Sequence, residues 1–157
     1  MRRDSDAGLA SIELVILLPA FALLVLLAIY LGRTNLAQSA VDGAAQDSAR
    51  AASLERNLDD AQAAALKAAQ ATLNATGSPC EPNTASVTIT NATPGHDPFD
   101  VPLGQASEVD LMVTCKVFLA DLVFPGLPIH NEVSITSTFA SPIDPYRLRT
   151  DATAPAP

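Results

Sequence analysis

The feature that most constrains this chain is an uncharged, almost wholly apolar run of 18 residues from Leu14 to Leu31. A helix of that length spans about 27 Å at about 1.5 Å per residue, close to the roughly 30 Å hydrocarbon core of a bilayer. No second apolar stretch of that length exists in the sequence. The run therefore predicts a single membrane crossing near the N-terminus.

The residues before the run predict its orientation. Arg2 and Arg3 precede it, and a basic flank of this kind stays in the cytoplasm. The bulk of the chain then lies outside. A cleaved secretory signal is the competing interpretation, but its apolar region usually has about 7 to 15 residues followed by a small-x-small site. The stretch from Tyr30 to Thr34 is a poor match to such a site.

The 126 residues after Leu31 are enough for one small domain, and its core is expected to be thin. Only 4% of residues are aromatic, there is no Trp, and much of the 48% apolar content is Ala. Small side chains bury little area, so the domain should need a crosslink or a partner. The formal charge is −8, and Lys and Arg form no cluster after Arg3, which argues against nucleic acid as a partner.

Glu13 lies directly before the apolar run, and a helix that serves only as a membrane anchor does not need a carboxylate at this position. A carboxylate in a spanning helix costs on the order of a few kcal/mol unless it reaches water or a cation. Before it stands Gly8-Leu9-Ala10-Ser11-Ile12, a glycine followed by four small or apolar residues. This spacing resembles the processing site of type IV pilin-like proteins, which a prepilin peptidase cuts after the glycine.

That resemblance implies that Leu9 becomes the mature N-terminus and that Glu13 becomes the fifth mature residue. The new amine then lies one helical turn from the carboxylate, and Glu13 of one subunit can pair with the amine of a neighbour as subunits stack. Such a pair offsets the cost of both charges. The alternative is a plain signal anchor, in which the Gly8 spacing is accidental.

The helical pattern continues past the membrane from Gly32 to Ala52. Small residues recur there at three- and four-residue steps, namely Ala37, Ala40, Ala44, Ala45, Ser48, Ala49 and Ala52. This stripe permits close approach of another element, either from the chain's own domain or from a neighbouring subunit. The pattern favours neither of these two interpretations.

A second helix is predicted from Asp59, which forms a capping-box pattern with Gln62, to about Asn74. Its predicted core face consists of Leu58, Ala65, Leu66, Ala69 and Leu73.

After Pro79 the hydrophobic period changes to two. Alternation at Val87–Ile89, Val109–Phe118 and Val133–Phe139 predicts three strands. Two helices followed by strands indicate an α+β fold with a small antiparallel sheet laid on a helix, as in pilins. The tail of Ala, Thr and Pro at residues 150–157 is predicted to be disordered.

Cys80 and Cys115 are expected to form a disulfide, because the cysteine count is even and the domain faces an oxidising compartment. The bond would connect the turn after the second helix to the middle strand. Two buried free thiols are the alternative.

No catalytic set is recognisable, so we expect no enzyme activity and no cofactor. His96 and His130 have no Cys, His or carboxylate at metal-ligand spacing, and no Gly-rich phosphate loop occurs. Asp97 and Asp100, with Asn91, offer the hard oxygen ligands that suit calcium, but their spacing matches no complete loop motif. We therefore predict no metal site.

Taken together, the chain resembles the TadE-like proteins, minor pilin-like (pseudopilin) subunits of the tight-adherence branch of type IV pilus systems. The matching stretches are Gly8 to Gly32, Val41 to Arg50 and, more weakly, Ser141 to Arg147. The resemblance implies a precursor in the bacterial cytoplasmic membrane with its N-terminus in the cytoplasm. Its parts would be a leader (1–8), a transmembrane helix (9–32), an extracytoplasmic pilin-like domain (33–149) and the tail (150–157).

The family also implies the partners: the prepilin peptidase, other pilin and pseudopilin subunits, the inner-membrane pilus assembly machinery and the lipid bilayer. The alternative function is a single-pass, membrane-anchored extracytoplasmic binding domain that does not polymerise. Only the pilin-like function requires removal of residues 1–8.

Overall fold

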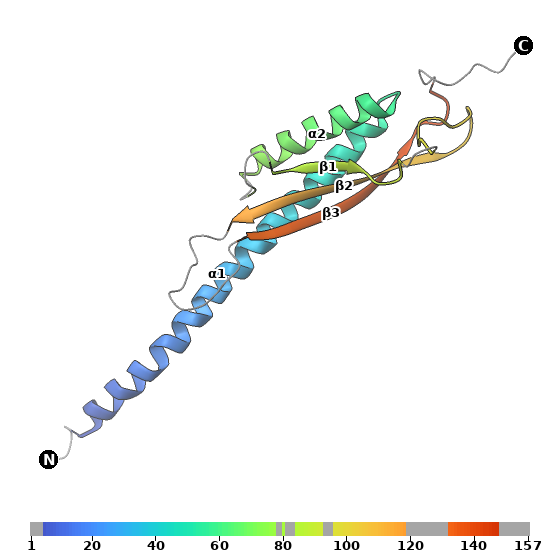
Figure 1. Cartoon of the computed structure of the whole chain (residues 1–157). Helices are drawn as coiled ribbons and strands as arrows, with labels where there is room; N and C mark the ends of the chain where they lie inside the picture. The colour runs from blue at the N-terminus through green and yellow to red at the C-terminus, as the bar shows by residue number, and fades with distance from the viewer. Residues whose placement is uncertain (1–4, 78–79, 81–83, 93–95, 119–131, 148–157) are drawn as a thin grey trace, which may run out of the picture. The chain divides into compact units, whose positions relative to one another are not determined.

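The computed structural model of the chain describes residues 5–77, 80, 84–92, 96–118 and 132–147 (Figure 1). His130 and the predicted disordered tail lie outside these residues. The chain divides into two compact units, Met1–Asn35 and Leu36–Pro157. Each unit is considered by itself below.

Two helices precede three strands along the chain. They are α1 (Ser5–Ser53), α2 (Leu58–Ala75), β1 (Ser86–Ile89), β2 (Ser107–Phe118) and β3 (Glu132–Ile143). The strands form one sheet in the order β1-β2-β3, and both neighbouring pairs are antiparallel. The predicted α+β class, with a long apolar N-terminal helix and a three-stranded antiparallel sheet, is confirmed.

In the first unit, α1 carries the apolar run. The large side chains from Leu14 to Leu31 that are exposed have exposed fractions between 43% and 69%. Leu, Ile and Val on every side of a helix are typical of a lipid-facing segment. Among the described residues, α1 is the one helix long and apolar enough to cross a membrane, so it is a candidate membrane anchor.

In the second unit, the sheet buries one face. β2 and β3 pair along twelve residues, from Ser107 opposite Ile143 to Phe118 opposite Glu132, whereas β1 pairs with β2 along only four. The buried side chains alternate along the strands and are Val87, Ile89, Val109, Leu111, Val113, Cys115, Val117, Ile135 and Ile143. The period of two therefore predicted the inward face of the sheet.

The small-residue stripe of α1 is buried within the chain's own domain. Its members Ala37, Ala40, Ala44, Ala45, Ser48, Ala49 and Ala52, together with Val41, are at most 8% exposed. Thr72 of α2 donates a 2.7 Å hydrogen bond to the Asp47 carboxylate of α1, and Ser141 of β3 donates one of 3.1 Å to Ser53. Of the two interpretations left open by the sequence, the structure supports packing on the chain's own domain for this stripe.

The details of α2 differ from the prediction. Its buried residues Ala61, Ala65, Ala69 and Leu73 recur every four positions, whereas Leu66 is one position off this face and 37% exposed. The N-cap is Asn57 and not Asp59, because the Asn57 side chain accepts a 2.8 Å bond from the Asp60 N–H. Gln62 plays no part in this cap and instead donates to the Val87 carbonyl oxygen of β1, beside which α2 runs in Figure 1.

The close packing of α1 can be tested with Ala44→Leu. Ala44 is fully buried, so extra methylene groups would force the surrounding elements apart and lower the free energy of unfolding by about 1 to 3 kcal/mol. Gln46→Leu places the same side chain on the exposed face of the same helix and should change the free energy of unfolding by less than about 0.5 kcal/mol. Urea unfolding in detergent micelles would measure the stability of both variants. Equal urea midpoints for Ala44→Leu and Gln46→Leu would contradict this packing.

Candidate processing and assembly site

The three residues of the predicted processing site lie on one continuous helix. Gly8, Leu9 and Glu13 all fall near the start of α1, which begins at Ser5. Their side chains lie outside what the structure describes, so only their backbone positions are used. Leu9 and Glu13 are four residues apart, and such residues lie on the same helix face about one turn from each other.

The bond between Gly8 and Leu9 directly follows the first four residues of α1. The first four N–H groups of a helix have no acceptor within the helix, so the turn just before this bond opens at lower cost than the turns that follow. A peptidase needs its substrate backbone accessible, and the end of a helix meets that need better than its middle.

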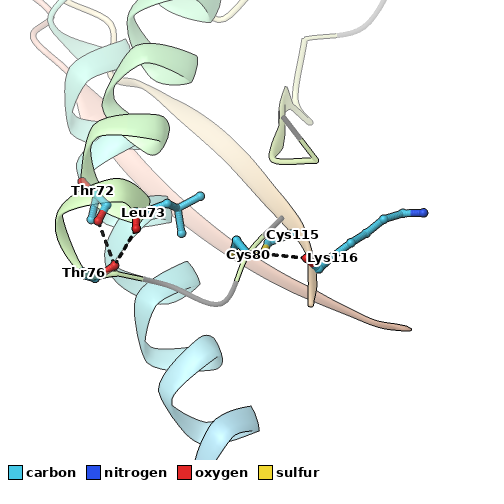
Figure 2. Close-up of a disulfide and its surroundings, with 6 residues drawn as sticks. All are labelled: Thr72, Leu73, Thr76, Cys80, Cys115 and Lys116. Atoms are coloured by element: carbon cyan, nitrogen blue, oxygen red, sulfur yellow. Dashed lines mark hydrogen bonds between the residues drawn. A yellow bond between two sulfur atoms is a disulfide. The ribbon is translucent and has the colours of Figure 1, made fainter. Parts of the chain in front are cut away.

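The second pair of predicted site residues is joined covalently. Cys80 and Cys115 form a disulfide with a Cα–Cα distance of 5.8 Å, and Figure 2 shows Cys80 meeting β2 from the segment that follows α2. Cys115 is fully buried, and the backbone of Cys80 forms an isolated antiparallel bridge with Val117. The bond thus holds the α2–β1 connection against β2, as expected from the sequence.

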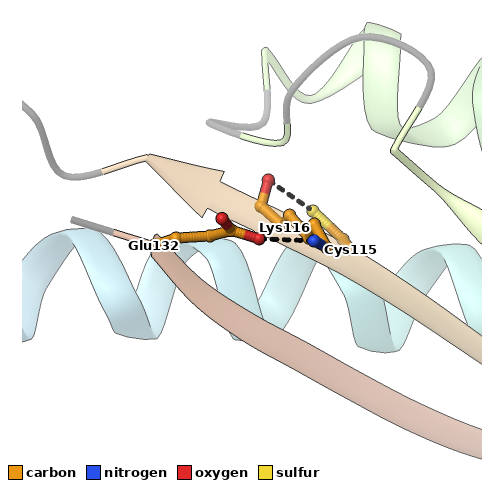
Figure 3. Close-up of polar contacts among 3 residues, drawn as sticks. All are labelled: Cys115, Lys116 and Glu132. Carbon is orange, nitrogen blue, oxygen red and sulfur yellow. Dashed lines mark hydrogen bonds and ion pairs between the residues drawn. The ribbon is translucent and has the colours of Figure 1, made fainter. Parts of the chain in front are cut away.

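An ion pair lies on the exposed face near the disulfide. Lys116 Nζ is 2.6 Å from Glu132 Oε1, with the side chains 51% and 42% exposed (Figure 3). Such an exposed pair contributes only about 0 to 1 kcal/mol. The Cys115 sulfur also lies 3.7 Å from the Lys116 carbonyl oxygen, a contact and not a hydrogen bond, since a disulfide sulfur carries no hydrogen.

Two of the three side chains considered for calcium form hydrogen bonds to backbone groups. Asn91 Nδ2 donates to the Glu108 carbonyl oxygen at 2.7 Å, and Asn91 Oδ1 accepts from the Asp110 N–H at 3.1 Å. Asp97 accepts a 2.8 Å bond from the Phe99 N–H. Within the described ranges, no three His, Cys, Asp or Glu side chains are grouped as a metal site would require. The structural role of Asn91 was missed, although an Asn directly after a predicted strand was a signal for it.

The contribution of the disulfide can be measured by replacing Cys80 with Ser and the buried Cys115 with Ala. Because the bond closes a loop of 35 residues, its loss should lower the free energy of unfolding by about 3 to 4 kcal/mol in the chain-entropy model. Urea unfolding with and without reductant would show this, since reductant should destabilise the parent and leave the double variant unchanged. Alkylation of both cysteines in the non-reduced parent would contradict the bond.

Comparison with known proteins gives one match. The model of the family described as "TadE-like protein" matches residues 8–50, which are α1 from the candidate processing site almost to its end. No curated protein and no solved structure matches the chain. α2 and the sheet lie outside the matched residues. Over residues 8–50 this chain is therefore similar to the TadE-like proteins, which confirms the resemblance seen in the sequence for the helix that carries Gly8, Leu9 and Glu13.

Proposed function

We propose that this chain is a minor pilin-like subunit of a tight-adherence pilus assembly system, matured by a prepilin peptidase that cuts after Gly8. The observation that carries the proposal is the extent of the family match, which begins at Gly8 and includes Leu9, Glu13 and the whole apolar run. The candidate processing site is thus part of a longer similarity to a pilin-like family and does not stand as an isolated short motif.

The energetics of Glu13 support the same proposal. Cleavage would make Leu9 the first residue of the helix, with its amine about 6 Å along the axis from the level of Glu13. A carboxylate near a helix N-terminus complements the positive end of the helix dipole. In a stack of subunits the carboxylate would be surrounded by apolar helices, where a neighbour's amine can offset its desolvation.

The proposal implies a location and a set of partners for the protein. The protein would sit in the bacterial cytoplasmic membrane with its N-terminus in the cytoplasm and residues 33–149 outside. Its partners would be the prepilin peptidase, other pilin and pseudopilin subunits and the inner-membrane assembly machinery. The exposed apolar side chains of α1 between Leu14 and Leu31 support contact with lipid before assembly and with other helices after it.

One observation favours the alternative of an anchored binding domain that does not polymerise. The small-residue stripe of α1 is buried by the chain's own domain, so it offers no surface to a neighbouring helix. The exposed side of the same segment is polar, with Gln38, Gln46 and Arg50. Helix contacts between subunits would then be confined to the apolar run. The state of the N-terminus separates the two functions, because only the pilin-like subunit loses residues 1–8.

Cleavage can be tested by Gly8→Val in cells that contain the prepilin peptidase. We expect the intact mass of the membrane-extracted parent to correspond to a chain that starts at Leu9, and that of the variant to a chain that keeps residues 1–8. Asp6→Ala, which changes the leader but leaves the cut bond unchanged, should be processed like the parent. A parent chain that starts at Met1 or near Arg33 would refute the processing step.

The role of Glu13 can be tested by Glu13→Gln. The amide keeps the shape of the side chain but removes its charge, so cleavage and insertion should equal those of the parent while recovery in sheared pili or crosslinked assembly complexes falls about fivefold or more. Asp42→Asn is the matched control, because it makes the same change on α1 at a position that bonds to Gln38 outside the apolar run. Equal recovery of all three proteins would remove Glu13 from the proposed role.

A further inference from the structure

The two edges of the sheet differ in how their backbone groups are paired. On the β1 side, Gln62 donates to the outward Val87 carbonyl oxygen, and the Asn91 amide pairs with the backbone of β2 beyond the end of β1. At the other end of β1, Cys80 forms the bridge to Val117 and is fixed there by its disulfide. Side chains and a crosslink thus satisfy this edge along most of the length of β2.

Among the residues that the structure describes, none protects the β3 edge in a comparable way. β3 is twelve residues long and has β2 as its only neighbour among the described strands. Its one charged residue, Glu132, is paired with Lys116, and its one proline, Pro142, is the penultimate residue. Edge strands are usually shortened, bulged or supplied with Lys or Pro, because unpaired backbone groups attract other strands. The stretch Val133–Ser141 carries none of these features.

The pairing identifies which backbone groups of β3 are unpaired. The Asp110 carbonyl oxygen accepts from the Thr90 N–H at 2.8 Å, and both its own N–H and the Glu108 carbonyl oxygen bond to Asn91. Even-numbered residues of β2 therefore direct their backbone toward β1, and odd-numbered ones toward β3. Since Leu111 lies opposite Phe139, odd-numbered residues of β3 bond to β2. The residues whose N–H and C=O point to the free edge are Ser134, Thr136, Thr138 and Ala140.

We propose that this edge accepts an extended segment of another polypeptide, which adds a fourth strand to the sheet in the assembled pilus system. Four evenly spaced residues with outward backbone groups and uncharged side chains match what strand addition uses for affinity. Phe139 lies on the same face of the sheet as the buried Ile135 and Ile143 but is itself 43% exposed, and an added strand would cover it. The inference rests on the proposed function, because it names how the subunit contacts a partner.

The partner strand is expected to come from a different, less acidic protein and not from a second copy of this chain. Each copy carries a formal charge of −8, so two copies repel one another.

The test uses Thr138→Pro in the full-length chain. Proline removes one outward N–H and is tolerated on an edge strand where that group faces away from the sheet. The variant should be cleaved, form the disulfide and keep the parent's thermal midpoint within a few degrees, but its recovery in crosslinked assembly complexes should fall about fivefold. Thr138→Val keeps the N–H and the β-branched shape, so it should be recovered like the parent.

A second measurement does not depend on the variant folding. Backbone amide exchange in the parent, resolved by residue, should be fast at Ser134, Thr136, Thr138 and Ala140 in micelles and at least about tenfold slower in the assembled complex. Protection of these amides in the purified chain alone would show a second copy as the occupant and overturn the proposal, as would unchanged exchange on assembly.

If the parent assembles but Thr138→Pro is recovered equally well, only the edge proposal fails. A parent that is absent from every assembly complex would overturn both the edge proposal and the proposed function.

Discussion

The second unit, Leu36–Pro157, depends on close packing of a helix face made of small residues, α2 and the buried face of a three-stranded sheet. Seven of the eight buried positions on this part of α1 are Ala or Ser, and Val41 is the exception. Small side chains let backbones approach closely, but each buries little apolar area. The core is therefore thin, and β2 supplies more of its larger side chains than any other element. Such a domain has little stability to lose, which explains why a disulfide placed on β2 matters to it.

The surface of α1 changes along its length. From Leu14 to Leu31 the surface of α1 is apolar all round, whereas from Ala37 to Ala52 one face is small and buried and the other is polar. This change falls near the boundary between the two compact units. Because the buried face serves the domain itself, the apolar run is left as the surface by which this helix could contact lipid or other helices.

The strands could be predicted well from the sequence, because a period of two with one buried face specifies which residues point inward. The run Leu14 to Leu31 was equally informative, since it predicted the long apolar helix that the structure shows as a candidate membrane anchor. The errors occurred in α2, where an Ala-rich pattern fits several faces: Leu66 was placed in the core and Ala61 was not. The cap at Asn57 was missed because Asp59 and Gln62 match a capping box equally well in sequence. Glu13 differs in kind, since the role proposed for it depends on a neighbouring chain.

The edges of the sheet show why sequence alone could not identify an interaction surface. A free edge depends on which strands are neighbours and on which backbone groups face outward. The alternation of side chains in the sequence predicts neither the strand order nor the direction of these groups. Gln62 and Asn91 are unremarkable polar residues until the structure places them against β1 and β2. Only then does the contrast with the unprotected edge of β3 become visible.

The central claim is that this chain is processed after Gly8 and then joins a larger assembly. The most direct test is N-terminal analysis of the chain in two fractions of the same cells, the inner membrane and the crosslinked or sheared pilus material. The account predicts that the chain occurs in the assembled fraction and that every copy there starts at Leu9. A chain that is confined to the membrane fraction and still starts at Met1 would contradict it.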